Sequence, residues 1–238
     1  QQDLADLRAL PGIVDAVQIN SIPISGSGWS TSIQTTANSE GDGVGSAVYM
    51  MDEHGLNALD LELIAGENFS PTDVGWRTLN QSNWPDKVII TRALADELYP
   101  DEDWQYALGK SLYVQDDQAI LVIGIIDKLQ APWVGWSGVE RSVLVPQYQL
   151  FDSSRYLIRA EPGMRDQLMP QVEEMLARTN EERMVRNLTS IEDRRNRSYR
   201  QHSAMVKMLS IIMVVLMLVT ALGIVGLASF NVNRRRKQ

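Results

Sequence analysis

The sequence predicts an α+β domain made of two subdomains, followed by a long helix that crosses a membrane. Short strand and helix patterns with regular spacing occur at both ends of the first 189 residues, and they flank a middle part entered at Gly66 and left near Val139. A run without any charged residue then extends from Met208 to Phe230. About 20 apolar residues suffice for a helix to cross the hydrocarbon of a bilayer.

Residues 1–65 are predicted to form the first part of a subdomain that is discontinuous in sequence. A short helix ends at Pro11-Gly12, since proline and glycine commonly close helices. Apolar and β-branched residues predict the strands, and the Gly- and Asn-rich stretches between them predict loops. The expected elements are a helix at 2–10, a helical turn at 54–59 and strands at 13–20, 29–36, 46–51 and 61–65.

Residues 66–139 are predicted to form the inserted subdomain. Ser70-Pro71 has the signature of a helix start, with serine as the N-cap and proline at the first helical position. Further elements are a helix at 92–99 and strands at 88–91, 111–115 and 119–126. The part ends in a Gly-containing loop that carries Trp133 and Trp136. These two rings are either anchors for a partner protein or a small core packed under the loop.

Residues 140–189 return to the first subdomain. A strand at 142–145 is expected to stop at Pro146, and a second strand covers 155–160. Leu168, Val172 and Leu176 recur at helical spacing, which predicts an amphipathic helix over 164–179. A last strand is expected at 183–188.

The remainder is predicted to be one helix of about 40 residues, since it has no Pro or Gly from its cap Ser190 until Gly223. Its parts are a stalk at 190–207, a transmembrane segment at 208–232 and a basic segment at 233–238. Glu192, Arg195 and Tyr199 are the stalk positions of interest, although charged residues at this spacing also suit a solvated face. The alternative for the apolar run is a buried helix of a large soluble core.

Four cations, Arg234, Arg235, Arg236 and Lys237, mark the exit of the helix as cytoplasmic, because positive residues are retained on that side. Residues 1–207 are therefore expected to be periplasmic or extracytoplasmic, and the span is expected to contact membrane lipid. The polar start of the chain has no export signal. We therefore expect the chain to be a fragment whose first membrane helix is missing.

The composition argues against several function classes. The chain has 22 basic and 30 acidic residues, and since four of the basic ones lie in the tail, the rest carries a net charge of −12. Nucleic acid is held by clustered Lys and Arg, so it is not expected as a partner. The absence of cysteine excludes disulfides, thiolate metal sites and thiol nucleophiles.

No motif predicts an enzyme, a metal site or a cofactor. Gly109-Lys110-Ser111 resembles the end of a phosphate-binding loop, but Trp104 stands where that loop needs its first glycine, and a strand instead of a helix follows. We expect a turn glycine before a strand. Asp101-Glu102-Asp103 lacks the spacing of a calcium loop and is expected to be a solvated turn. His54 and His202 belong to no recognisable catalytic or metal-binding motif.

Several short motifs follow one another along the chain. They are Gly66-Glu67-Asn68-Phe69, Val88-Ile89-Ile90-Thr91 with Ala93-Leu94-Ala95, Gly109-Lys110 before a strand, Val122-Ile123-Gly124-Ile125 and Val145-Pro146. In this order they resemble the MacB-like periplasmic core domain of ABC transporter permeases. The apolar span followed by Asn233-Arg234-Arg235-Arg236-Lys237 resembles the second membrane helix of FtsX-like permeases. Glu67 departs from the family, which usually has arginine at that position.

The resemblance implies a split βαβ porter-like unit (1–65 and 140–189) with an inserted sabre-like unit (66–139). It also implies a permease subunit in the bacterial inner membrane that works as a dimer with a cytoplasmic ABC ATPase. Motion would pass through the stalk to a periplasmic partner or substrate, either for export or for mechanotransmission. The alternative is an extracytoplasmic sensor domain of a receptor or histidine kinase, which also leads by a helix into a membrane span.

Overall fold

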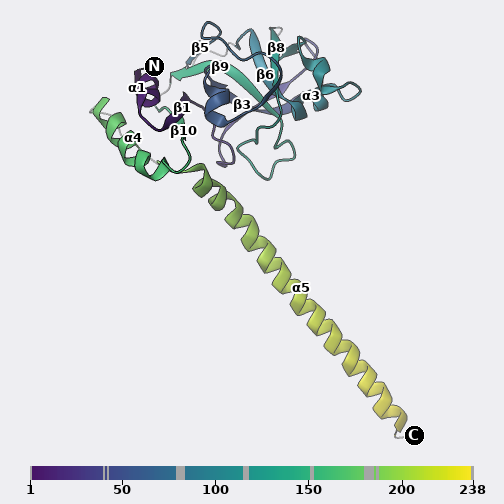
Figure 1. Cartoon of the computed structure of the whole chain (residues 1–238). Coiled ribbons are helices and arrows are strands. Elements are labelled where there is room, and N and C mark those ends of the chain that lie inside the picture. The colour runs from purple at the N-terminus through teal and green to yellow at the C-terminus, as the bar shows by residue number, and fades with distance from the viewer. Residues whose placement is uncertain are drawn as a thin grey trace. The chain divides into compact units, whose positions relative to one another are not determined.

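A computed structural model of the chain describes residues 2–39, 41, 43–78, 84–114, 118–150, 153–179, 185 and 188–236, without the side chains of 179, 198–204 and 224–236. Contacts divide the chain into two units, Gln1–Ser190 and Ile191–Gln238, which are considered separately here. The first unit is mixed α and β, and the second is one helix (Figure 1). The α+β prediction is confirmed.

Strands dominate the first unit. They are β1 (Ile13–Gln18), β2 (Trp29–Ile33), β3 (Val44–Met51), β4 (Leu63–Gly66), β5 (Gly75–Thr78), β6 (Lys87–Thr91), β7 (Ser111–Tyr113), β8 (Ala119–Ile126), β9 (Ser142–Leu150) and β10 (Tyr156–Ala160). The helices are α1 (Gln2–Ala9), α2 (Gly55–Leu59), α3 (Arg92–Leu98), a 3-10 turn η1 (Trp104–Ala107) and α4 (Arg165–Thr179).

The main sheet has eight strands and curls on itself. Its path is β2-β3-β9-β6-β8-β4, while β5 pairs with β9 and β7 pairs with β8. Figure 1 shows β3, β9, β6 and β8 side by side. Gln34, just after β2, and Tyr113 at the end of β7 exchange two backbone hydrogen bonds of 2.9 Å. The end of β2, the first strand of the path, thereby meets β7, which pairs with β8 near the other end of the path.

Alternation along the strands gives the sheet two apolar faces, as expected for a strand period of two. On β3, Val48 and Met50 belong to one buried cluster, and Ala47, Tyr49 and Met51 belong to another. The first cluster also contains α3, which follows β6 directly and buries Leu94, Ala95 and Leu98. The second cluster covers the opposite face with residues from β1, α2 and the segment after β8.

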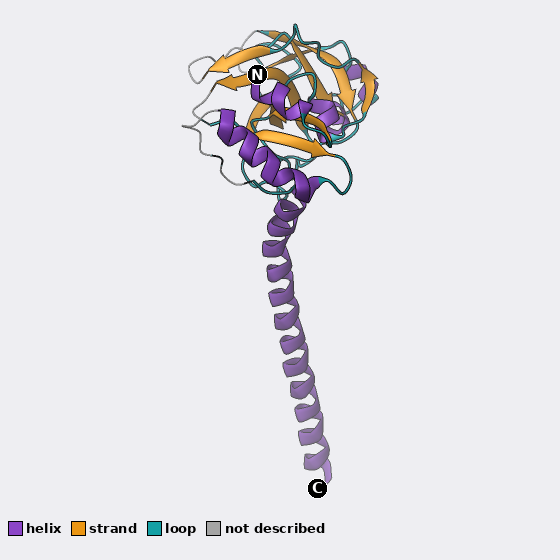
Figure 2. Cartoon of the chain, turned by 60° about the vertical axis from the view of Figure 1, so that its left-hand side comes forward, coloured by secondary structure: helices purple, strands orange, loops and turns teal. Residues whose placement is uncertain are grey.

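A second, two-stranded sheet joins the two ends of the unit. β1 pairs antiparallel with β10, so residues 13–18 and 156–160 lie together although they are far apart in sequence. Helices α1 and α4 pack near this sheet around a third cluster formed by Leu4, Leu7, Ala16, Tyr148, Val172 and Leu176 (Figure 2). Val185 packs against the same cluster. The rest of the strand predicted at 183–188, except Leu188, lies outside the described residues.

The main sheet takes strands from all three predicted parts of the domain. β3 comes from residues 1–65, β6 and β8 come from 66–139, and β9 comes from 140–189. The contacts group these strands in a single compact unit. The pairing of β1 with β10 agrees with a discontinuous terminal part, while the division of the domain at residues 66 and 139 stays a prediction.

Two local predictions are wrong. Ser70 does not start a helix, because its backbone N–H and its hydroxyl both donate to Asp73 Oδ2, at 2.9 Å and 2.7 Å, and close a turn. Pro146 does not stop a strand, because β9 continues to Leu150. Proline cannot donate to a neighbouring strand. It is tolerated here because β9 changes partners at this point, with β3 pairing up to Pro146 and β5 pairing from Gln147 onward.

Glycine is required where β4 meets β8. Gly66 has φ +80 and is paired with Gly124. A Cβ at Gly66 would lie 2.1 Å from the carbonyl oxygen of Ile123, far inside contact distance. Only glycine adopts this conformation without strain and allows so close a backbone approach.

The second unit is the helix α5 (Ile191–Arg236), 46 residues long. The sequence contains no proline in this range, so every turn can keep its backbone hydrogen bonds. The predicted continuity of stalk and span in one helix is therefore confirmed.

Candidate functional site

A buried polar cluster joins the start of the chain to the main sheet. Asp52 follows β3 directly, and its side chain is fully buried. Arg8 of α1 donates from Nη2 to Asp52 Oδ2 at 2.7 Å, and the Tyr148 hydroxyl of β9 donates to the same oxygen at 2.9 Å. The backbone N–H of His54 donates to the other oxygen, Oδ1, at 3.0 Å. A buried charge is stable only when paired in this way.

Arg8 also connects Asp52 with Asp15 of β1. Its Nε lies 3.3 Å from Asp15 Oδ1 and donates to the carbonyl of Ala16 at 2.9 Å. Burial raises the pKa of the Asp15 carboxyl. Hydrogen bonds from Asn57 Nδ2 at 2.7 Å, from the Ala16 N–H and from His54 outweigh that effect and leave the pKa below its usual value. The cluster therefore attaches α1, β1 and α2 to the main sheet through charged groups.

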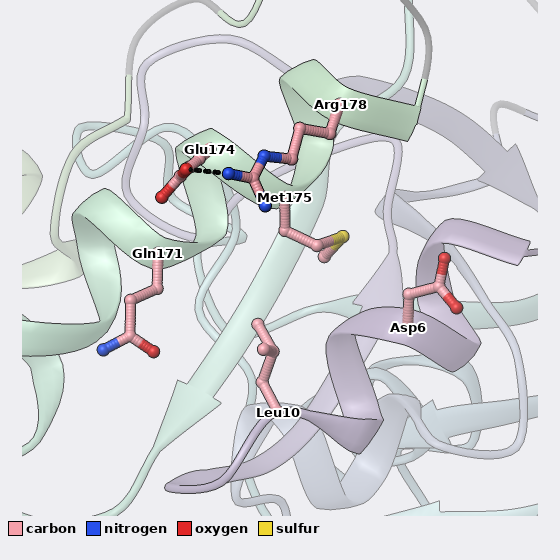
Figure 3. A pocket seen from close by; sticks show the side chains of 6 residues that line it. All are labelled: Asp6, Leu10, Gln171, Glu174, Met175 and Arg178. Atoms are coloured by element: carbon pink, nitrogen blue, oxygen red, sulfur yellow. Dashed lines mark hydrogen bonds and ion pairs between the residues drawn. The ribbon is translucent and has the colours of Figure 1, made fainter.

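A groove of about 560 Å³ lies between α1 and α4. Figure 3 shows Leu10 and Met175 between the two helices, with Asp6 and Gln171 at the sides. Arg178 is turned toward Glu174 one turn earlier, and the two form an ion pair of 2.6 Å.

Helix α5 contains one segment suited to a membrane, Met205–Gly223, with a mean hydropathy of 2.5. None of this segment is buried, and its large apolar side chains are 44–71% exposed from Met205 to Leu222. The hydroxyls of Ser210 and Thr220 donate at 2.8 Å to the carbonyls of Val206 and Leu216, one turn earlier. Polar groups in lipid must be satisfied within the helix in this way. The buried core helix considered as an alternative does not fit these exposures.

A family model described as the MacB-like periplasmic core domain matches residues 1–176. The chain belongs to this family. The MacB-like core thus covers the compact unit as far as Leu176 in α4, and α5 comes later in the sequence. The resemblance inferred from the sequence motifs is confirmed, and the chain is a MacB-like periplasmic domain of the ABC transporter permease class.

Three solved structures are similar to this chain over about three quarters of its length. The periplasmic region of MacB from Actinobacillus actinomycetemcomitans is 16% identical, with 75% of this chain and 72% of that chain covered and a TM-score of 0.49. The extracellular domain of the transporter YknZ from Gram-positive bacteria is 16% identical, with 75% and 82% covered and a TM-score of 0.47. A permease domain from Porphyromonas gingivalis is 18% identical, with 74% and 75% covered and a TM-score of 0.45. No curated protein matches the chain.

In this MacB-like domain, Trp133 and Trp136 lie against the second apolar cluster. Their ring centroids are 6.1 Å apart in an edge-to-face arrangement, and Arg141 lies over the Trp136 ring at 5.3 Å. Both rings are partly buried, as expected for a small core under the loop. Their partly exposed edges leave the role of a partner contact as a prediction.

The predicted stalk and exit residues lie on α5. Glu192 and Arg195 are exposed in its first turns. Tyr199, Arg234, Arg235 and Arg236 are helical in their backbone, but their side chains and Lys237 lie outside what the structure describes. Their roles as lever and membrane exit therefore stay predictions.

The Gly109-Lys110-Ser111 motif is a turn before β7, as expected. Gly109 has φ +75, and Lys110 Nζ lies 4.0 Å from the centroid of the Tyr106 ring. Asp103, at the end of the acidic turn, accepts from the Gln105 N–H at 3.0 Å and caps η1. Within the described ranges, no three His, Cys, Asp or Glu side chains come together as a metal site.

Sequence reasoning missed the Arg8 cluster. Arg8 and Asp52 are 44 residues apart, and Tyr148 is a further 96 residues beyond Asp52. No motif connects them, and a charged residue near the end of a short helix is ordinarily solvated. The pairing of β3 with β9 brings Asp52 close to Tyr148, and Arg8 reaches Asp52 from α1.

Proposed function

We propose that this chain is the periplasmic domain and following membrane helix of a MacB-type ABC transporter permease that couples cytoplasmic ATP hydrolysis to motion outside the membrane. The family assignment supports the permease class over a sensor domain. ATP hydrolysis itself is assigned to a separate ABC ATPase, because the one motif resembling a phosphate-binding loop is a turn with Lys110 over Tyr106.

The continuity of α5 is the observation that carries the proposal. At 1.5 Å per residue, its 46 residues extend for roughly 69 Å, whereas the hydrocarbon of a bilayer is about 30 Å thick. The membrane-suited segment Met205–Gly223 occupies only part of this length. One hydrogen-bonded rod thus includes both the span and a charged segment, Glu192 to Arg197, that belongs in water. Such a rod can pass rotation or displacement from one end to the other.

Orientation and partners follow from the same proposal. The orientation with the C-terminal end on the cytoplasmic side of a bacterial inner membrane and residues 1–207 in the periplasm is supported by the four cations Arg234, Arg235, Arg236 and Lys237. A second permease protomer and an ABC ATPase complete the transporter. The loop with Trp133 and Trp136 is the candidate contact for a periplasmic partner.

The test breaks the rod without changing either end. Tyr199→Pro removes a backbone donor and kinks the helix, at a cost of about 3 kcal/mol or more. In the intact transporter, we expect Tyr199→Pro to keep ATPase activity and to lose transport. Tyr199→Ala is the matched control, because it removes the same side chain and preserves the helix. Transport and ATPase activity are measured on the same preparation.

Insertion is verified independently in both variants. The chain has no cysteine, so a single Ser154→Cys substitution in the domain reports its side of the membrane by reaction with an impermeant maleimide. Normal transport by a Tyr199→Pro variant that is inserted with Ser154→Cys outside would show that α5 is only a tether.

A further inference from the structure

Arg77 lies on β5 between two tryptophan rings. Its Cζ is 5.7 Å from the centroid of Trp29 on β2 and 5.8 Å from that of Trp84, which precedes β6. Along β5, side chains alternate, so Arg77 lies on the strand face opposite Trp76, which packs on Tyr148 at 5.0 Å. Cations within about 6 Å of an aromatic centroid are attracted to its face. The guanidinium is therefore held by two ring faces.

The guanidinium of Arg77 is not fully satisfied. Its Nη1 is buried and has no hydrogen-bond partner in the described part of the chain. The sequence between Thr78 and Trp84 is Leu-Asn-Gln-Ser-Asn, which contains no carboxylate. A buried donor without an acceptor costs about 1–3 kcal/mol, and more when the group is charged. Burial also lowers the pKa of Arg77, because the charged form is penalised.

Two other arginines in the described ranges lie over tryptophan rings, and both are paired with acids. Arg92 lies 5.8 Å from the Trp104 ring and forms an ion pair of 3.2 Å with Asp127. Arg141 lies over Trp136 and forms an ion pair of 3.0 Å with Glu97. Arg77 also lies over tryptophan rings, but among the described residues no carboxylate forms an ion pair with it.

A cavity of about 130 Å³ lies beside the Arg77 side chain. It is lined by Trp29, Ser30, Thr31, Val48, Met50, Arg77 and Trp84. Val48 and Met50 are buried and apolar, whereas Trp29 is 36% exposed. A water molecule occupies about 30 Å³ in the liquid, so the space corresponds to roughly four waters. Drug-sized ligands need about 300 Å³ or more, so the cavity suits a small group.

We propose that this pocket, the Arg77 pocket, binds a carboxylate carried on a short apolar stem, of about the size of a glutamate side chain. Arg77 supplies the charge and the donors that the carboxylate lacks in an apolar site, and its planar fork suits two parallel hydrogen bonds. Val48, Met50 and the two tryptophan rings contact the stem. The bound carboxylate pairs with Arg77 in the way that Asp127 pairs with Arg92 and Glu97 pairs with Arg141. This inference is independent of the transport mechanism proposed above.

The test uses the full chain in lipid nanodiscs and two probes of equal size, propionate and the uncharged propionamide. Saturation-transfer NMR detects their binding, since it suits millimolar affinities. We expect saturable binding of propionate and none of propionamide. Arg77→Leu should weaken propionate binding by at least about tenfold, because it removes the charge-assisted hydrogen bonds. Arg77→Lys should weaken it less, because the charge remains but the fork is lost.

Arg92→Leu is the matched control, since it removes an arginine from a tryptophan ring at a site already paired with Asp127, and it should leave propionate binding unchanged. Equal binding of propionate and propionamide, or full binding by Arg77→Leu with a native circular dichroism spectrum, would overturn the proposal. A blocked glutamate, N-acetyl-glutamate amide, distinguishes the source of the carboxylate. Tighter binding than propionate supports a protein side chain, and binding of propionate alone supports a free small acid.

Discussion

Leucine residues in the two units of this molecule have opposite environments. Leu94 of α3 is fully buried, whereas Leu216 of α5 is 60% exposed. The compact unit places its apolar side chains in clusters between strands and helices, but α5 exposes them along the whole segment Met205–Gly223. Exposed apolar surface of this extent marks contact with a membrane or another protein. The same residue type therefore stabilises the compact unit by packing in its core and makes the surface of α5 suited to contact with lipid.

The largest expected effect comes from applying one substitution to both units. Leu94→Ala should lower the free energy of unfolding of the compact unit by about 2–5 kcal/mol, through lost burial and the cavity left behind. Leu216→Ala should change it by less than about 0.5 kcal/mol, because Leu216 packs against no core. Urea unfolding of the full chain in detergent, followed by tryptophan fluorescence, measures both. A loss above 2 kcal/mol for Leu216→Ala would show that α5 belongs to a protein core.

A buried charge sharpens the same comparison, because in the compact unit even a charged side chain can lie in the interior and stabilise the fold through its hydrogen bonds. Asp52 accepts hydrogen bonds from Arg8, Tyr148 and the His54 N–H while fully buried. We expect Asp52→Asn to lower the free energy of unfolding by about 1.5–3 kcal/mol at pH 7, since hydrogen bonds to a charged group are lost. Thermal or urea unfolding measures the change.

The matched control for that prediction is Asp101→Asn, which makes the same chemical change in an exposed turn. It should stay within about 0.5 kcal/mol of the parent protein. Equal effects of the two substitutions would mean that the Arg8 cluster does not attach α1 to the main sheet.

Most elements of the compact unit were predictable from the sequence because their residues have a clear period or composition. The strand at 119–126 and the helix over 164–179 agree with β8 and α4 to within one residue. Each is decided by the local apolar pattern and its turn residues. The continuity of α5 was predictable for the same reason, since helix breakers are local features.

The sites were not predictable in this way, because they depend on how distant strands pair. The Arg77 pocket combines β2, β3, β5 and Trp84, and the sequence shows Arg77 only as one residue beside Trp76. Apolar periodicity says which face of a strand is buried but not which strand lies next to it. The composition of the loop alone was enough to single out Trp133 and Trp136. How the two rings pack became visible only in the folded structure.

The Ser70 segment shows how a local signature fails. Ser-Pro-Thr-Asp fits a helix cap, yet the following residues Val74-Gly75-Trp76 enter β5 instead. Asp73 accepts from the Ser70 N–H, as the acidic residue of a capping box does, but the Ser70 hydroxyl donates to Asp73 instead of accepting from a backbone N–H. Capping residues satisfy backbone groups in turns as well as in helices, so tertiary pairing with β9 decides between the two.

The same turn gives the smallest expected effect, since Asp73 is a surface counterpart of Asp52. Lys87 Nζ lies 2.8 Å from Asp73 Oδ1, and Ser70 donates twice to Oδ2. The hydrogen bond from Lys87, followed by those from Ser70, lowers the pKa of Asp73 to about 2. The ordinary pKa of an aspartate is about 3.9, so the folded state favours the ionised carboxylate.

The contribution of Asp73 to stability is therefore fully present above about pH 4 and is lost as the pH falls through about 4 to 2, where the folded state also binds the proton. The melting temperature of the parent protein minus that of Asp73→Asn should be constant from pH 7 to 5 and then shrink toward pH 2. Lys87→Met should shrink this difference at neutral pH, because one partner is gone while the Ser70 bonds remain. Water screens a pair whose Lys87 side chain is exposed, so the expected shifts in melting temperature are small, a few degrees at most. A difference in melting temperature that stays constant down to pH 2 would show that the pKa of Asp73 is the same in the folded and unfolded states.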